Sequence, residues 1–261
     1  MNKGIISPEY YIGRYIYLQE ELSKLPRVTF NHLGSYEAVS IVIYDPQSRK
    51  DVRKRITERN PQWEQYRQIA EKRLKLEDQL RKTKASWKSE YRGSLEQIAS
   101  EYTIIRNEDE LYSSDLFDSL VEDSNGFPKD KAVAHDCIQM RSLFETEVAE
   151  ILDNLGIEYK YEAALNLGGN KPVFPDFSLN LPEYNRCAFI EVLGLLGNVG
   201  YVNYNSMKLD KYVNAGLYPN RDFALISGDY NYRPDHDTIK RIIGVLLDAL
   251  ARQYVVRKSK R

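Results

Sequence analysis

Residues 188–194 read AFIEVLG, an apolar, strand-forming run that is interrupted by one acid, Glu191. Fifteen residues earlier a second acid, Asp176, follows a proline in the stretch FPDF at 174–177. Removing a carboxylate from water costs on the order of several kcal/mol unless the group is paired or binds a metal ion. Two such acids on neighbouring strands therefore predict a cation site, and a magnesium-dependent phosphodiesterase site is the obvious candidate.

The segments around these acids alternate between helical and strand patterns. Residues 133–155 place apolar side chains on one helical face, and Gly156 supplies a helix end. Turn residues then separate the next apolar segments. Strands are predicted at 158–166, 173–180, 187–193 and 223–227, and helices at about 203–215 and 235–254. The predicted order is αβββαβα, which indicates an α/β domain.

The first hundred residues follow a different pattern. Ser7 and Pro8 predict a helix start, with the serine as the cap and the proline in the first turn. Residues 28–44 are rich in alternating and β-branched residues, which predicts a β-hairpin with Gly34-Ser35 at its turn. Pro61 opens a highly charged segment with a thin apolar stripe, which is typical of an extended helical arm.

The net charge of -1 hides an uneven distribution. Residues 49–92 contain fifteen Lys or Arg against seven acids, whereas residues 107–130 contain eight acids and Lys129 alone among cations. The basic segment predicts either a DNA-binding surface or a solvated helix face. The acidic segment predicts a domain linker or a loosely packed connector. Three parts follow: the arm-bearing segment 1–106, the connector 107–132 and the domain 133–261.

The composition argues against several other classes of protein, namely disulfide-rich, zinc-binding and membrane proteins. Two cysteines and three scattered histidines provide neither a disulfide framework nor a four-ligand zinc site. No apolar run approaches the roughly 20 residues that span a bilayer, and the N-terminus lacks a basic segment followed by an apolar one. We therefore expect a cytoplasmic protein without a membrane partner.

The element order and several motifs resemble the restriction-endonuclease-like superfamily, whose PD-(D/E)xK nucleases share an αβββαβ core. The likeness covers about residues 133–230, and several motifs resemble a bacterial branch of this superfamily. It is carried by RSLFE at 141–145, PDF at 175–177, IEVLG at 190–194, Tyr201 and KLDKY at 208–212. The resemblance implies Glu145, Asp176 and Glu191 as the acids around Mg²⁺, with Mn²⁺ as a substitute. Hard oxygen ligands of this kind suit Mg²⁺.

The superfamily pattern has a lysine two residues after the glutamate, where this chain has Leu193. The resemblance assigns the missing charge to Lys208, ahead of Lys211. Lys208 lies seven residues after Tyr201 and four before Tyr212, so the three side chains share one helical face. A cation there would orient the attacking water or stabilise the phosphate in the transition state.

Three functional hypotheses follow from these patterns. The first is a Mg²⁺-dependent endonuclease that cuts DNA, with RNA left open as a substrate. The second is a catalytically silent module that binds nucleic acid or acts as a scaffold. The third treats residues 1–106 as an interaction arm that joins the chain to a second copy or to a larger defence or mobile-element complex.

Each candidate residue also has a plain structural interpretation. Glu145 would be a solvated acid on a helix surface, and Asp176 would be a turn acid after proline. Glu191 would form an ion pair with an arginine such as Arg141, and Lys208 would be a helix lysine that faces water. If there were no metal site, several of these separate structural interpretations would all have to be correct at once. The metal site is therefore the favoured interpretation.

Overall fold

The computed structural model describes residues 4–33, 36–108, 110–129, 132–135, 137–169 and 171–259. At its centre lies a four-stranded sheet in the order β10-β9-β8-β7. Its strands are β7 (Glu158–Tyr161), β8 (Phe177–Leu181), β9 (Arg186–Leu193) and β10 (Phe223–Ser227). Strand β8 runs antiparallel to both β7 and β9, and β10 runs parallel to β9. The chain is therefore a mixed α/β protein.

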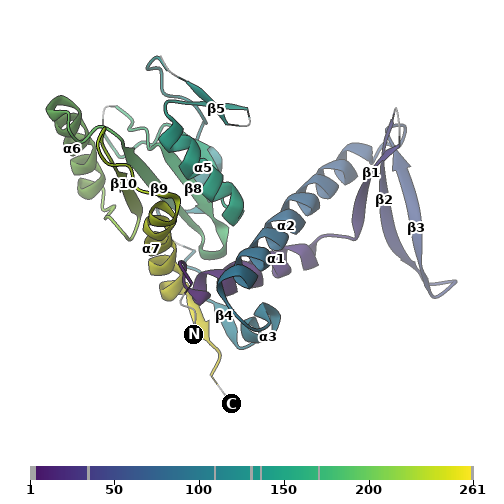
Figure 1. Ribbon diagram of the computed structural model, residues 1–261. Helices are drawn as coiled ribbons and strands as arrows, with labels where there is room; N and C mark the ends of the chain where they lie inside the picture. Colours follow the sequence, from purple (N-terminus) through teal and green to yellow (C-terminus); the bar gives the residue numbers. More distant parts are fainter. Residues whose placement is uncertain are drawn as a thin grey trace.

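Helices cover both faces of this sheet (Figure 1). Helices α5 (Leu143–Leu155) and α7 (His236–Tyr254) pack on one face, and α6 (Val199–Asn214) packs on the other. Every residue of β9 is buried, and its side chains alternate between the two faces. The predicted αβββαβα order is confirmed for these elements, although β7 ends five residues earlier than predicted.

Helix α1 (Pro8–Lys24) packs into the same core as α5 and α7. Its Tyr10, Tyr11 and Ile12 are each 1% exposed, so the core draws on both the 1–106 and the 133–261 parts of the sequence. The predicted helix start is confirmed, but the predicted capping role of Ser7 is wrong because its side chain makes no capping hydrogen bond. The three-part division of the chain stays a prediction.

The predicted hairpin is a three-stranded antiparallel sheet. It consists of β1 (Val28–Leu33), β2 (Tyr36–Asp45) and β3 (Lys50–Thr57), and the predicted turn at Gly34-Ser35 lies outside the described residues. Strand β3 was not expected because most of its residues are charged, which hides the period of two. The predicted long helix is confirmed as α2 (Trp63–Glu90), whose first turns pack against this sheet.

The segment 107–132 was expected to be loosely packed, and this is wrong for its middle part. Helix α4 (Ser114–Ser119) buries Phe117, which is 1% exposed, against the face of the central sheet that α6 also covers. The Lys160 ammonium of β7 donates to the carbonyls of Phe117 and Leu120 and fixes this helix on the sheet. One large apolar side chain, Phe117, therefore packs this acidic segment against the central sheet.

The helix predicted over 133–155 begins ten residues later, at α5, because Ser142 caps it by accepting a hydrogen bond from the Glu145 N–H. Before it, β5 (Val133–His135) and β6 (Ile138–Met140) form a small antiparallel pair. The remaining elements are α3 (Leu95–Ala99), β4 (Tyr102–Ile104), the 3₁₀ helix Pro182–Tyr184 and β11 (Val255–Arg257), which pairs with β4. Within the described ranges, no helix has the length and apolar character to cross a bilayer.

Candidate active site

Two acids from neighbouring strands form the centre of the site. Asp176 directly precedes β8, and Glu191 lies near the end of β9. The antiparallel pairing of Phe177 with Ile190 brings the start of β8 beside the end of β9, so Asp176 comes next to Glu191. The Val192 N–H donates to Asp176 Oδ2 at 2.6 Å, which holds this carboxylate against β9. The sheet therefore assembles the predicted pair of acids.

Helix α6 covers Glu191 with two hydrogen-bond donors. Glu191 is 1% exposed, its Oε2 lies 2.6 Å from the Lys208 ammonium, and its Oε1 accepts from the Tyr212 hydroxyl. Lys208 also donates to the Phe174 carbonyl at 2.5 Å. Lys211, the alternative lysine, is exposed. Lys208 is thus the lysine that reaches the acids, and its interpretation as a water-facing lysine is wrong.

The buried acid and its lysine influence each other's ionisation. Burial raises the pKa of Glu191 to about 7, although the Lys208 ammonium acts in the opposite direction. Burial disfavours the charge on Lys208, yet the Glu191 and Asp176 carboxylates raise its pKa overall. Burial also raises the pKa of Asp176. The site therefore contains a lysine that stays charged, beside acids whose ionised forms are stabilised by a positive neighbour.

Glu145 lies in the first turn of α5 and is only 7% exposed, so its interpretation as a solvated surface acid is wrong. Its Oε2 accepts from the Arg141 N–H and from the Tyr161 hydroxyl, both at 2.8 Å. Burial, followed by the charge of Asp176, raises the pKa of Glu145 to about 7. Asp176 also raises the pKa of Glu191, which makes it the acid that links the other two.

A fourth buried acid, Glu162, was not expected from the sequence. It is 2% exposed and accepts from the Arg141 guanidinium at 2.5 and 3.1 Å, while its N–H donates to the Asp176 carbonyl at 3.1 Å. Its backbone has a φ of 44°, so the chain bends here and the predicted strand 158–166 ends early. Because Arg141 pairs with Glu162, the suggested ion pair between Arg141 and Glu191 is wrong.

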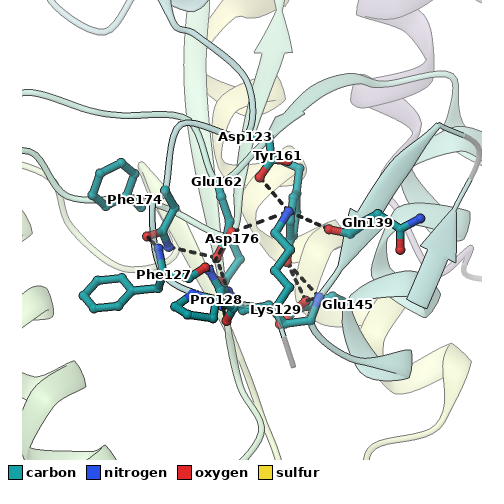
Figure 2. A network of polar contacts seen from close by, with 12 residues as sticks. Asp123, Phe127, Pro128, Lys129, Gln139, Glu145, Tyr161, Glu162, Phe174 and Asp176 are labelled. Atoms are coloured by element: carbon teal, nitrogen blue, oxygen red, sulfur yellow. Dashed lines mark hydrogen bonds and ion pairs between the residues drawn. The ribbon is translucent and has the colours of Figure 1, made fainter. Parts of the chain in front are cut away.

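Lys129 completes the cationic side of this network (Figure 2). Its ammonium lies 2.5 Å from Asp123 Oδ1 and 3.9 Å from Glu162 Oε2, and it sits 4.8 Å from the centre of the Tyr161 ring. Figure 2 shows Glu145, Tyr161 and Glu162 gathered around this contact. Glu162 thus has two cationic partners, Arg141 and Lys129, and Lys129 belongs to the segment that was predicted to be a connector.

The oxygen atoms differ in their availability to a metal ion. Asp176 Oδ1 and Glu145 Oε1 accept no hydrogen bond from the described residues, whereas both oxygens of Glu191 are engaged. In the part of the chain that the structure describes, no group of three or more His, Cys, Asp or Glu side chains is arranged to hold a metal ion. The donor chemistry fits Mg²⁺, but Glu191 must exchange a partner to serve as a ligand.

An open pocket of about 560 Å³ lies at the start of α5. It lies between the start of α5, the residues after β9 and the loop after β10, and its wall includes Arg141, Phe144, Gly194 and Arg233. The Arg141 guanidinium is ion-paired with Glu162, which links this wall to the acid cluster, although among the described residues none of the four acids lines the pocket.

Comparison with known proteins adds no relative: no family model, no curated protein and no solved structure matches the chain. The functional inference therefore rests on the residues of the site. Its strongest features are the paired strands that carry Asp176 and Glu191 and the lysine that α6 places on Glu191.

The raised pKa of Glu145 gives a testable pH dependence. Its pKa rises from 4.5 unfolded to about 7 folded, so the folded protein binds more protons between these values and loses stability as the pH rises through this window. Above pH 7 the loss amounts to about 3 kcal/mol. In EDTA, Glu145→Gln is therefore expected to raise the melting temperature above pH 7 and to change it little near pH 4.5. An equal change at both pH values would contradict the assignment.

Proposed function

We propose that this chain is a Mg²⁺-dependent endonuclease that hydrolyses DNA phosphodiester bonds on a restriction-endonuclease-like αβββαβ core. The observation that carries the proposal is the position of Asp176 and Glu191 on paired strands, with the Lys208 ammonium 2.6 Å from Glu191. The element order α5-β7-β8-β9-α6-β10 supports the core. A buried cluster of acids with one retained lysine favours phosphodiester chemistry over acid–base chemistry at carbon.

Each residue of the cluster has a distinct role in the proposal. Asp176 and Glu145 offer the free carboxylate oxygens that would hold Mg²⁺, and Glu191 offers another when it exchanges a partner. Bound Mg²⁺ would polarise the phosphodiester and lower the pKa of an attacking water. Lys208 provides a positive charge that can hold a phosphate oxygen and stabilise the charge that develops on it. Tyr212 keeps the Glu191 side chain oriented.

The first experiment compares the wild type with Glu191→Ala on plasmid and oligonucleotide DNA in Mg²⁺ and in Mn²⁺. Metal-dependent nicking that is lost in the variant would support the nuclease. Nicking that is equal in both proteins would remove Glu191 from the reaction. A melting curve of each protein shows whether loss of activity reflects loss of the fold.

The two lysines of α6 provide a matched pair of variants. Lys208→Met keeps the apolar stem and removes the charge, and we expect it to lower kcat about 100-fold or more with a smaller change in KM, because its charge acts on the transition state. Lys211→Met changes an exposed side chain, and we expect less than about a twofold effect. Equal activity of the two variants would assign the catalytic charge elsewhere.

A catalytically silent nucleic-acid-binding module is the second candidate. It is favoured by the engagement of both Glu191 oxygens, because Lys208 and Tyr212 satisfy this acid without a metal ion. This module would bind DNA or RNA equally well in EDTA and in Mg²⁺, and it would produce no strand breaks with any divalent metal. Salt-sensitive binding without cleavage would therefore replace the first candidate by the second.

A further inference from the structure

The sheet β1–β3 projects from the rest of the molecule on helix α2 (Figure 1). Helix α2 contacts the central sheet at Lys75, whose ammonium lies 2.5 Å from Glu158 Oε1. The helix starts at Trp63, twelve residues earlier (75 − 63), which corresponds to about 18 Å of helix at 1.5 Å per residue. The projecting sheet therefore presents a surface of its own to large ligands.

Strand β3 carries three consecutive cations, Arg53, Lys54 and Arg55, and all three are exposed. None of them forms an ion pair with a described residue, and Arg49 and Lys50 add two more exposed cations at the same end of the strand. Alternation along a strand directs Arg53 and Arg55 to one face of the sheet and Lys54 to the other. The outer edge of the sheet is thus positively charged on both faces.

The cations of helix α2 differ from those of β3 because many of them are neutralised within the helix. Arg67 pairs with Glu64 and Glu71, and Arg73 pairs with Glu77. Arg81 and Lys82 both pair with Asp78. Although the basic segment 49–92 includes both elements, its unpaired charge therefore concentrates on β3.

The shape of this edge indicates which polyanion it fits. Strand β1 pairs with β2 only as far as Ile41, so the ends of β2 and β3 beyond it, residues 42–45 and 50–53, continue as a two-stranded antiparallel ribbon. In this ribbon Ile43 pairs with Val52, and the two side chains are 48% and 46% exposed. The major groove of B-DNA is about 12 Å wide and admits such a ribbon, and phosphates line both of its walls. The deep, narrow major groove of A-form RNA does not admit side chains in this way. Cations on both faces with an apolar pair between them match the DNA groove.

We propose that the ends of β2 and β3 form a DNA-binding ribbon that docks in the major groove of duplex DNA, while Arg53, Lys54 and Arg55 at the base of the ribbon contact phosphates on the two walls. The choice of DNA rests on the proposed function, but the binding itself requires no metal ion and no cleavage. The ribbon would hold the duplex while the acid cluster acts on a separate position along it. Exposed Ile43 and Val52 would contact base edges such as thymine methyl groups.

The test compares two triple variants of the full chain that remove the same charge. Arg53→Ala/Lys54→Ala/Arg55→Ala changes the ribbon, and Lys72→Ala/Arg81→Ala/Lys84→Ala changes α2, whose three cations are ion-paired. Fluorescence anisotropy in EDTA with a duplex of about 20 base pairs, roughly two helical turns, measures affinity over roughly 50 to 200 mM salt. Melting curves establish that both variants fold.

The ribbon variant is expected to bind DNA at least about 10-fold more weakly, with a salt slope smaller by up to about three units. The α2 variant is expected to lose less than about threefold, because its cations already have protein partners. Equal losses in the two variants, or an unchanged ribbon variant, would overturn the proposal. Equal affinity of the wild type for duplex RNA or for anionic vesicles would also overturn it. Because EDTA prevents metal-dependent cleavage, a failed nuclease assignment would leave this result unaffected.

Discussion

Asp176→Asn is expected to lower Mg²⁺-dependent DNA cleavage by about 10³-fold or more while leaving the fold intact. An asparagine still has a side-chain oxygen that can accept from the Val192 N–H, which lies 2.6 Å from Asp176 Oδ2. The substitution removes the charge and the strong oxygen donor that a divalent ion needs, and metal stabilisation is worth several kcal/mol in the transition state. Single-turnover cleavage and a melting curve together measure the two effects.

Asp210→Asn is the matched control for this prediction. Asp210 lies on α6 but is exposed, so the same chemical change there should leave cleavage within about twofold of the wild type. A second comparison measures the rise in melting temperature on addition of Mg²⁺, which should be present in the wild type and the control and absent in Asp176→Asn. Full cleavage by Asp176→Asn would remove this acid from the proposed reaction.

The largest effect on stability is expected at the ion pair between Arg14 and Glu183. Arg14 is 1% exposed, Glu183 is 0% exposed, and Arg14 Nη1 lies 2.8 Å from Glu183 Oε2. Glu183→Ala would leave a buried guanidinium without its counter-charge, which costs about 3–5 kcal/mol. The free energy of unfolding, measured by urea titration, should fall by this amount.

Glu20→Ala provides the control because Glu20 pairs with Arg106 at the surface, where the two side chains are 48% and 36% exposed. Loss of such a pair costs about 1 kcal/mol or less. The double variant Arg14→Met/Glu183→Leu removes both charges and should recover stability relative to Glu183→Ala, since no unpaired charge remains. If Glu183→Ala and Glu20→Ala lowered the free energy of unfolding equally, the buried pair would contribute no more to stability than the surface pair.

The strands of the central sheet were predictable because they are apolar and bounded by turn residues. The run that contains Glu191 has this pattern, and an acid inside it stands out. Lys208 could also be predicted from the sequence, since the period of a helix places it on the same face as Tyr212. Its contact with Glu191 depends on the packing of α6 against β9, which residue spacing alone does not determine.

Other features were hidden for physical reasons. Strand β3 is mostly charged, so its period of two is visible only once β2 supplies a pairing partner. Glu162 follows directly on β7 at a bend with positive φ, and in sequence it is one acid among many. The hairpin of β5 and β6 was merged into the following helix because both carry apolar residues at short spacing.

The contact between α1 and α7 has a consequence for how the chain folds. Tyr10, Tyr11 and Ile12 near the beginning of the chain share a core with Leu246 and Leu250 near its end. During synthesis, these first apolar side chains emerge more than two hundred residues before the helix that covers them. Contacts of such long sequence separation slow folding, because much of the chain must be ordered before they form. Helix α1 is therefore expected to complete its native packing only once α7 has been synthesised, even though α2 can cover part of it earlier.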